Sequence, residues 1–132
     1  MTKYLNKLIL VTLVSLFMFS ACKKSDKKPQ EESRTVKYEI TGNFTGKLTV
    51  IYNDNVTGNT VLTEVPLPFS KTVTYGSNVK GIGFGANSST VSAPGQNAKI
   101  TIYSHTGAVL ATDTQPTGAS GELSSPTIAY IF

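Results

Sequence analysis

From residue 35 onward, short runs of β-branched and aromatic residues alternate with clusters of Gly, Asn, Pro and Ser. This alternation is typical of a β-sandwich or barrel, because each run is long enough for one strand and each cluster supplies a turn. No run has the apolar spacing of an amphipathic helix. The sequence therefore predicts an all-β domain over residues 35–132, with strands at 35–41, 47–53, 60–65, 69–75, 79–86, 99–103, 108–112 and 127–132.

Alternate residues of these strands define a predicted core. In the first strand Val36, Tyr38 and Ile40 share one face, and Lys37 and Glu39 share the other. Successive side chains of a strand point to opposite faces, so we expect the apolar set to be buried. The same spacing predicts further core residues, namely Leu48, Val50, Tyr52, Phe69, Val73, Tyr75, Ile82 and Phe84.

Turn residues divide the predicted strands. Pro66 and Pro68 cannot donate backbone hydrogen bonds, so we expect a crossing between sheets or a sheet edge there. Residues 104–107 predict a tight hairpin turn. The longest predicted loops are residues 88–97 and 114–125.

The N-terminal segment predicts export. Lys3 and Lys7 precede an uncharged apolar run at residues 8–19, and Ser20 and Ala21 are small. A positive start, a short apolar stretch and small residues before the cut describe a secretory signal. The run is short of the roughly 20 apolar residues of a spanning helix. We therefore expect residues 1–21 to be a cleaved signal peptide.

The only cysteine of the chain, Cys22, follows this segment directly. Phe19, Ser20 and Ala21 together with Cys22 resemble the lipobox of bacterial lipoproteins, although leucine usually stands where Phe19 does. The resemblance implies that the lipoprotein signal peptidase recognises these three residues. It also implies that Cys22 carries acyl chains such as palmitate, with membrane lipid as its partner. The alternatives are an uncleaved signal anchor and an ordinary signal peptide with an incidental Cys22.

Residues 22–34 predict a disordered spacer. After Cys22 this segment has no aromatic, aliphatic or β-branched residue, so it cannot bury enough apolar surface to order itself. It would reach about 40 Å when extended and roughly 20 Å as a flexible coil. Lys23 occupies the position where aspartate commonly retains lipoproteins in the inner membrane, so an envelope location at the outer membrane is favoured.

The formal net charge of +4 does not point to nucleic acid. The signal segment and the spacer each contribute a net charge of +2, and residues 35–132 contain five lysines and five acids. A nucleic-acid-binding domain usually carries a basic patch or stripe. We therefore expect no nucleic-acid partner.

Residues that could carry catalysis or hold a metal are scattered. His105 is the only histidine and lies in a predicted turn, and no cysteine is left to complete a zinc site. Two acids could meet in the fold as a glycosidase pair, but the sequence does not indicate which two. Gly81, Gly83 and Gly85 lack the helix that a phosphate-binding loop needs, so they predict close packing or a bulge in a strand. We expect a non-enzymatic protein without a metal or cofactor.

Four segments in order resemble the MmpS family of mycobacterial membrane proteins. They are residues 36–42 (VKYEITG), 52–54 (YND), 65–73 (VPLPFSKTV) and 100–109 (ITIYSHTGAV), and the resemblance covers nearly all of the domain. It implies an immunoglobulin-like antiparallel β-sandwich of about seven or eight strands. It also implies an accessory role beside a resistance-nodulation-division transporter that exports lipids or siderophores.

Two departures from that family weaken the transporter prediction more than the fold prediction. The relatives are held by an N-terminal transmembrane helix, which this chain replaces with a lipobox, and they carry paired cysteines that are absent here. We expect the domain to dock onto an envelope protein, with Phe69 and Lys71 as contacts. Burial of Phe69 in the core and simple solvation of Lys71 are the competing interpretation.

The alternative function is a glycan- or small-ligand-binding module displayed on the envelope. The domain contains five tyrosines that could form a platform or belong to the core. A continuous apolar surface near residues 66–69 would favour protein docking. A tyrosine-lined concavity would favour a ligand.

Overall fold

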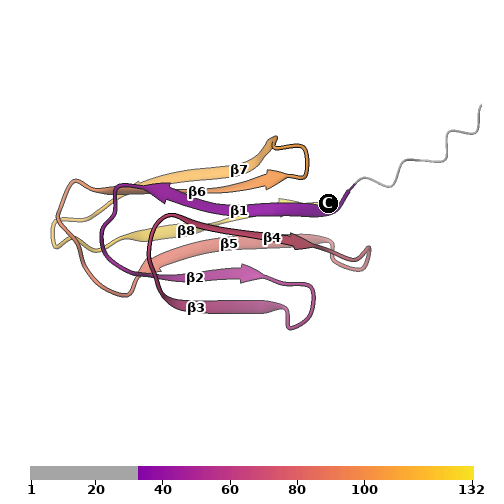
Figure 1. Cartoon of the computed structure of the whole chain (residues 1–132), viewed down its shortest axis with the longest axis horizontal. Helices are drawn as coiled ribbons and strands as arrows, with labels where there is room; N and C mark the ends of the chain where they lie inside the picture. Colours follow the sequence, from indigo (N-terminus) through magenta and orange to yellow (C-terminus); the bar gives the residue numbers. More distant parts are fainter. Residues whose placement is uncertain (1–32) are drawn as a thin grey trace, which may run out of the picture. The chain divides into compact units, whose positions relative to one another are not determined.

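The computed structural model describes residues 33–132, which contain eight strands and no helix (Figure 1). The predicted signal peptide and Cys22 lie outside the described residues, as does the spacer except for Ser33 and Arg34. The strands are β1 (Thr35–Gly42), β2 (Leu48–Asn53), β3 (Asn59–Val65), β4 (Phe69–Thr74), β5 (Gly81–Ser88), β6 (Asn97–Ser104), β7 (Val109–Pro116) and β8 (Ser124–Ile131).

The strands form two antiparallel sheets of four. The first sheet has the order β4-β1-β6-β7, and the second has the order β3-β2-β5-β8. Only β2–β3 and β6–β7 are hairpins, and every other connection crosses from one sheet to the other. The predicted antiparallel β-sandwich of about seven or eight strands is confirmed, since two four-stranded sheets are joined by crossing connections.

The core lies between the two sheets and is built from the predicted alternating residues. Tyr38 and Phe84 are fully buried, and their ring centroids lie 4.9 Å apart. Tilted aromatic pairs of this kind add about 0.5–1.5 kcal/mol beyond the area they bury. Phe69 and Val73 are half-buried and pack against the core, and the remaining predicted positions are buried, namely Val36, Ile40, Leu48, Val50, Tyr52, Tyr75 and Ile82.

The strand ends differ most from the prediction in the last two strands. β7 continues to Pro116 and β8 begins at Ser124, so the predicted loop at residues 114–125 shortens to 117–123. The extension of β7 is stabilised by pairing of β6 with Thr114, Gln115 and Pro116. Hydrogen bonding to a neighbouring strand holds this polar segment extended, and apolar periodicity cannot reveal it.

The segment that contains Pro66 and Pro68 connects β3 to β4 and crosses between the sheets, as predicted. Both strands are also edges of their sheets. Just before the crossing, the pairing of β3 with β2 shifts register between Leu48 and Val50, which marks a bulge in β3. Glu64 adopts a left-handed φ of 58° at this bulge.

The sandwich has two ends with different loops (Figure 1). The chain enters at Ser33, and the loops at residues 54–58, 75–80 and 105–108 lie at this end together with Phe132. We call it the entry end. The loops at residues 43–47, 66–68, 89–96 and 117–123 form the far end.

Candidate interaction surfaces

The predicted lipid anchor concerns residues that the structure does not describe. Phe19, Ser20, Ala21 and Cys22 all lie outside residues 33–132. Lipidation of Cys22 and recognition by the signal peptidase therefore stay predictions.

The two predicted partner contacts, Phe69 and Lys71, lie on edge strand β4. The ring of Phe69 packs against Tyr52 and Phe84, with centroids 6.5 Å and 6.4 Å away. Leu67 also packs against the core, so the Pro66–Phe69 segment offers no continuous apolar surface for docking. The role of Phe69 and Lys71 in partner binding stays a prediction.

The register of β4 against β1 explains why a charged residue stands at position 71. Lys71 pairs with buried Tyr38 across β1 and β4, so its backbone directs the side chain to the core side of the edge strand. The side chain is nevertheless exposed. Inward-directed charges on edge strands discourage pairing with a strand of another chain. Lys71 therefore protects the open edge of the first sheet.

The tyrosines do not form an exposed platform in the described part of the chain. Tyr38, Tyr52 and Tyr75 are buried, and Tyr103 and Tyr130 are half-buried. The Tyr75 hydroxyl donates to the Asn53 carbonyl, and the phenolic oxygens of Tyr38 and Tyr75 lie 2.6 Å apart. Burial raises the pKa of Tyr38 and of Tyr75.

A shallow hollow of about 300 Å³, the entry hollow, lies at the entry end. Its walls are mainly apolar, and His105 and hydroxyl groups of the β6–β7 turn contribute polar atoms. The lining residues come from the start of β1, the β6–β7 hairpin and the end of β8, namely Ser33, Arg34, Val36, Ser104, His105, Thr106, Ala108, Leu110, Tyr130 and Phe132. This is a concavity with two aromatic walls, the kind of surface that accepts a small ligand.

Arg34 fastens the entering chain to this end of the sandwich. Its guanidinium carbon lies 4.1 Å from the centre of the Phe132 ring. The Nε group donates to the Gly76 carbonyl at 3.1 Å, and one terminal nitrogen donates to the Val79 carbonyl. A backbone hydrogen bond adds to these contacts, since the Tyr75 N–H donates to the Arg34 carbonyl at 3.1 Å. The sequence assigns Arg34 to the end of the spacer, and its side chain lies against the domain.

A second hollow, of about 280 Å³, adjoins the β6–β7 turn on its other side. It shares Val36, Ser104 and His105 with the entry hollow. Lys37 lies at its rim, 2.8 Å from the Glu39 carboxylate and 4.5 Å from the centre of the Tyr103 ring. Its charge is thus already balanced within the first sheet.

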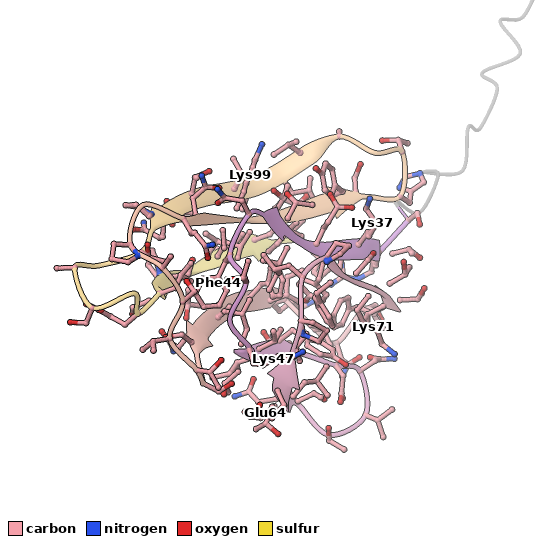
Figure 2. All side chains as sticks on the ribbon, turned by 60° about the vertical axis from the view of Figure 1, so that its left-hand side comes forward. Lys37, Phe44, Lys47, Glu64, Lys71 and Lys99 are labelled. Carbon is pink, nitrogen blue, oxygen red and sulfur yellow. The ribbon has the colours of Figure 1, made fainter. Side chains whose placement is uncertain are left out.

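The two sheets differ sharply in charge. The strands of the first sheet carry Lys37, Glu39, Lys71, Lys99 and Asp113. Those of the second sheet carry only Glu64, at the bulge of edge strand β3. In Figure 2 the labelled lysines 37, 71 and 99 lie with the first sheet, and Glu64 lies at the opposite margin.

The outer side of the second sheet, which we call the apolar face, exposes aliphatic side chains around a glycine strand. Val61 on β3 is 56% exposed, and its neighbour Ile51 on β2 is 38% exposed. Across β5, Ala129 and Ile131 of β8 are also exposed. Exposed aliphatic residues on an uncharged surface favour contact with another protein.

Two of the three glycines of β5, Gly83 and Gly85, allow close packing against Thr127, whereas a Cβ at Gly81 would make only ordinary contacts. A Cβ at Gly85 would lie 3.0 Å from the Thr127 hydroxyl oxygen, and one at Gly83 would lie 3.2 Å from its methyl carbon. The Gly83 N–H donates to the Asn53 side chain. The β5–β8 pairing also shifts register between Phe84 and Ala86, which marks a bulge or irregularity there.

Asp54 organises the β2–β3 loop at the entry end. Its carboxylate accepts hydrogen bonds from the N–H groups of Val56 and Thr57, and from the hydroxyls of Thr57 and Thr60. These hydrogen bonds, first of all that from the Thr57 hydroxyl, hold the pKa of Asp54 well below its ordinary value. The sequence indicated only a polar turn here.

The described residues include no group of three or more His, Cys, Asp and Glu side chains placed to hold a metal ion. Within residues 33–132 there is also no helix with the length and apolar character of a membrane span.

No family model and no curated protein matches this chain. The resemblance to the MmpS family therefore stays a prediction.

Proposed function

We propose that this chain is a non-enzymatic lipoprotein of the cell envelope, anchored through acylated Cys22, whose sandwich binds an envelope protein through the apolar face. The observation that carries the binding role is the contrast between the two sheets. One outer face is charged and polar, and the other exposes Val61, Ile51 and Ile131 with a single charge at its margin. The buried core of a protein–protein interface is likewise apolar and poor in charged residues.

The resemblance to the MmpS family supports a particular class of partner. That family implies an accessory role beside a resistance-nodulation-division transporter. A lipid anchor would keep the sandwich close to the membrane, where such a complex assembles. The outer membrane is the favoured location, because Lys23 does not provide the usual retention signal.

Two experiments in cells test this function. Metabolic labelling with palmitate should mark the wild-type chain and leave the Cys22→Ala variant unmarked. Crosslinking and pull-down should then enrich an envelope protein with wild type. Val61→Asp should lose that protein, and Thr72→Asp, on the outer side of the charged sheet, should retain it. Equal enrichment by both aspartate variants would contradict the assignment of the face.

A second candidate function, binding of a small ligand, is favoured by the entry hollow. Tyr130 and Phe132 line the hollow with aromatic rings, and Ser104 and Thr106, whose hydroxyl oxygens lie 2.8 Å apart, add polar atoms. An NMR screen of glycans and small amphipathic molecules would test it. A true ligand should shift the amide signals of Thr106 and Ala108 and leave that of Val61 in place.

A further inference from the structure

We propose that the entry end of the sandwich rests against the anionic lipid surface, with the β2–β3 loop as its leading contact. This inference depends on the proposed anchor at Cys22. It goes beyond that anchor because it assigns an orientation to the domain and names the residues that touch the head groups.

The length of the chain before the domain selects this end. A chain as long as the segment between Cys22 and Arg34 would span roughly 20 Å as a flexible coil, so an acylated Cys22 would keep Ser33 near the membrane. An eight-residue strand adds about 26 Å from the entry end to the far end. The entry end therefore reaches the head groups readily, whereas the far end reaches them only when the spacer approaches its extended length of about 40 Å.

Exposed apolar side chains gather at this same end. Val56, at the tip of the β2–β3 loop, is 91% exposed, and Ile131 and Val109 are also exposed. A lone exposed valine is ordinary on a protein surface. Here three such residues share the end where the tether joins the domain and are spread across it, because Val109 begins edge strand β7, Ile131 ends edge strand β8, and Val56 lies in the loop before β3 at the opposite margin (Figure 1).

The β2–β3 loop is built to present Val56. Asp54 closes the loop through its N–H, which donates to the Gly58 carbonyl at 2.7 Å. Its carboxylate accepts the Val56 N–H, also at 2.7 Å, so the loop backbone is held while the valine side chain faces solvent. A held loop loses less conformational entropy on contact than a flexible one.

The charges of this end suit an anionic surface. Lys80 is exposed in the β4–β5 loop, and the guanidinium of Arg34 lies nearby against the Gly76 and Val79 carbonyls. The Asp54 carboxylate accepts hydrogen bonds from its own loop and stays ionised, so it offsets one of these two positive charges. The part of the spacer that precedes Arg34, residues 22–33, adds a net charge of +1. Basic residues next to a membrane anchor are attracted to anionic lipids.

A dye on a single cysteine tests this orientation in the lipidated full chain. Acylation blocks Cys22, so Val56→Cys or Val91→Cys supplies the only free thiol. Val91 is a matched control because it is 64% exposed in a far-end loop. Each variant is labelled with nitrobenzoxadiazole and bound to vesicles of phosphatidylethanolamine and phosphatidylglycerol that contain a lipid-borne quencher.

We expect the dye at position 56 to shift to the blue and to be quenched several-fold more than the dye at position 91. Replacing phosphatidylglycerol with phosphatidylcholine should reduce the difference. An equal response at both positions, or a stronger one at position 91, would overturn the orientation while leaving the anchor intact. Reaction of the dye with the unsubstituted chain would show a free Cys22, which would overturn the anchor and this inference with it.

Discussion

The phenolic oxygens of Tyr38 and Tyr75 lie 2.6 Å apart between the two sheets. Tyr38 belongs to β1 of the first sheet, and the Tyr75 hydroxyl donates to the carbonyl of Asn53 at the end of β2 in the second. The Tyr38 hydroxyl must then donate to the Tyr75 oxygen, because the Tyr75 proton is already used. This chain of two hydrogen bonds ties the sheets together near the entry end.

Removing either hydroxyl should destabilise the sandwich by different amounts. Tyr38→Phe removes only the hydrogen bond from Tyr38 to the Tyr75 oxygen, and we expect the unfolding free energy to fall by about 1 kcal/mol. Tyr75→Phe also leaves the Tyr38 hydroxyl and the Asn53 carbonyl without this partner, so its cost should be larger, about 1–3 kcal/mol. Urea denaturation of both variants measures the difference. The ordering is wrong if Tyr38→Phe proves the more damaging change.

The same pair predicts a loss of stability at high pH. Burial raises the pKa of Tyr38 and of Tyr75, so the folded state holds their protons more tightly than the unfolded state does. This stability is fully present below the ordinary tyrosine pKa of about 10 and is lost as the pH rises above it. Unfolding free energy measured against pH should therefore decline in alkali, and less steeply in Tyr38→Phe. Identical slopes would contradict this cause.

The lowered pKa of Asp54 predicts a loss of stability in acid. Hydrogen bonds lower its pKa in the folded state, so its contribution is present above the ordinary aspartate pKa of about 3.9 and is lost as the pH falls below that value. Because the carboxylate holds the Val56 and Thr57 amides, NMR should show these two signals shifting together in acid. Asp54→Ala should remove this transition and leave the amides of the β6–β7 turn unchanged.

Lys71 predicts a change in self-association. Replacing it with valine would leave an uncharged, strand-forming residue on the open edge of β4, where another chain could pair. We expect Lys71→Val to form larger species in analytical ultracentrifugation at concentrations where wild type stays monodisperse. Lys99→Val removes the same charge from β6, an interior strand, and should behave like wild type. Matching behaviour of the two variants would rule out edge protection.

The sequence predicted local structure well because it depends on neighbours along the chain. Alternation of apolar residues located all eight strands and core residues such as Tyr38 and Phe84. The sheet membership of each strand could not be predicted, because β1 pairs with β4 and β6 from distant parts of the chain. For the same reason the charge contrast between the sheets became visible only once the strands were assigned to them.

The contacts at the entry end could not be predicted from the sequence, for a related reason. Arg34 ends a charged spacer, and nothing in its neighbours indicates that it would lie over Phe132, the other end of the domain. The entry hollow likewise combines the starts and ends of strands that are far apart in sequence. By contrast, Asp54 followed by Val56 and Thr57 is a local arrangement, and its turn chemistry could have been recognised.

Site-specific photocrosslinking in living cells tests the proposed function most directly. A photoreactive amino acid at position 51 lies on the apolar face, and one at position 72 lies on the outer side of the charged sheet. We expect position 51 to capture one envelope protein reproducibly, position 72 to capture none, and the Cys22→Ala background to abolish the capture. Equal capture from both positions, or capture that persists without Cys22, would contradict a lipid-anchored module that binds through this face.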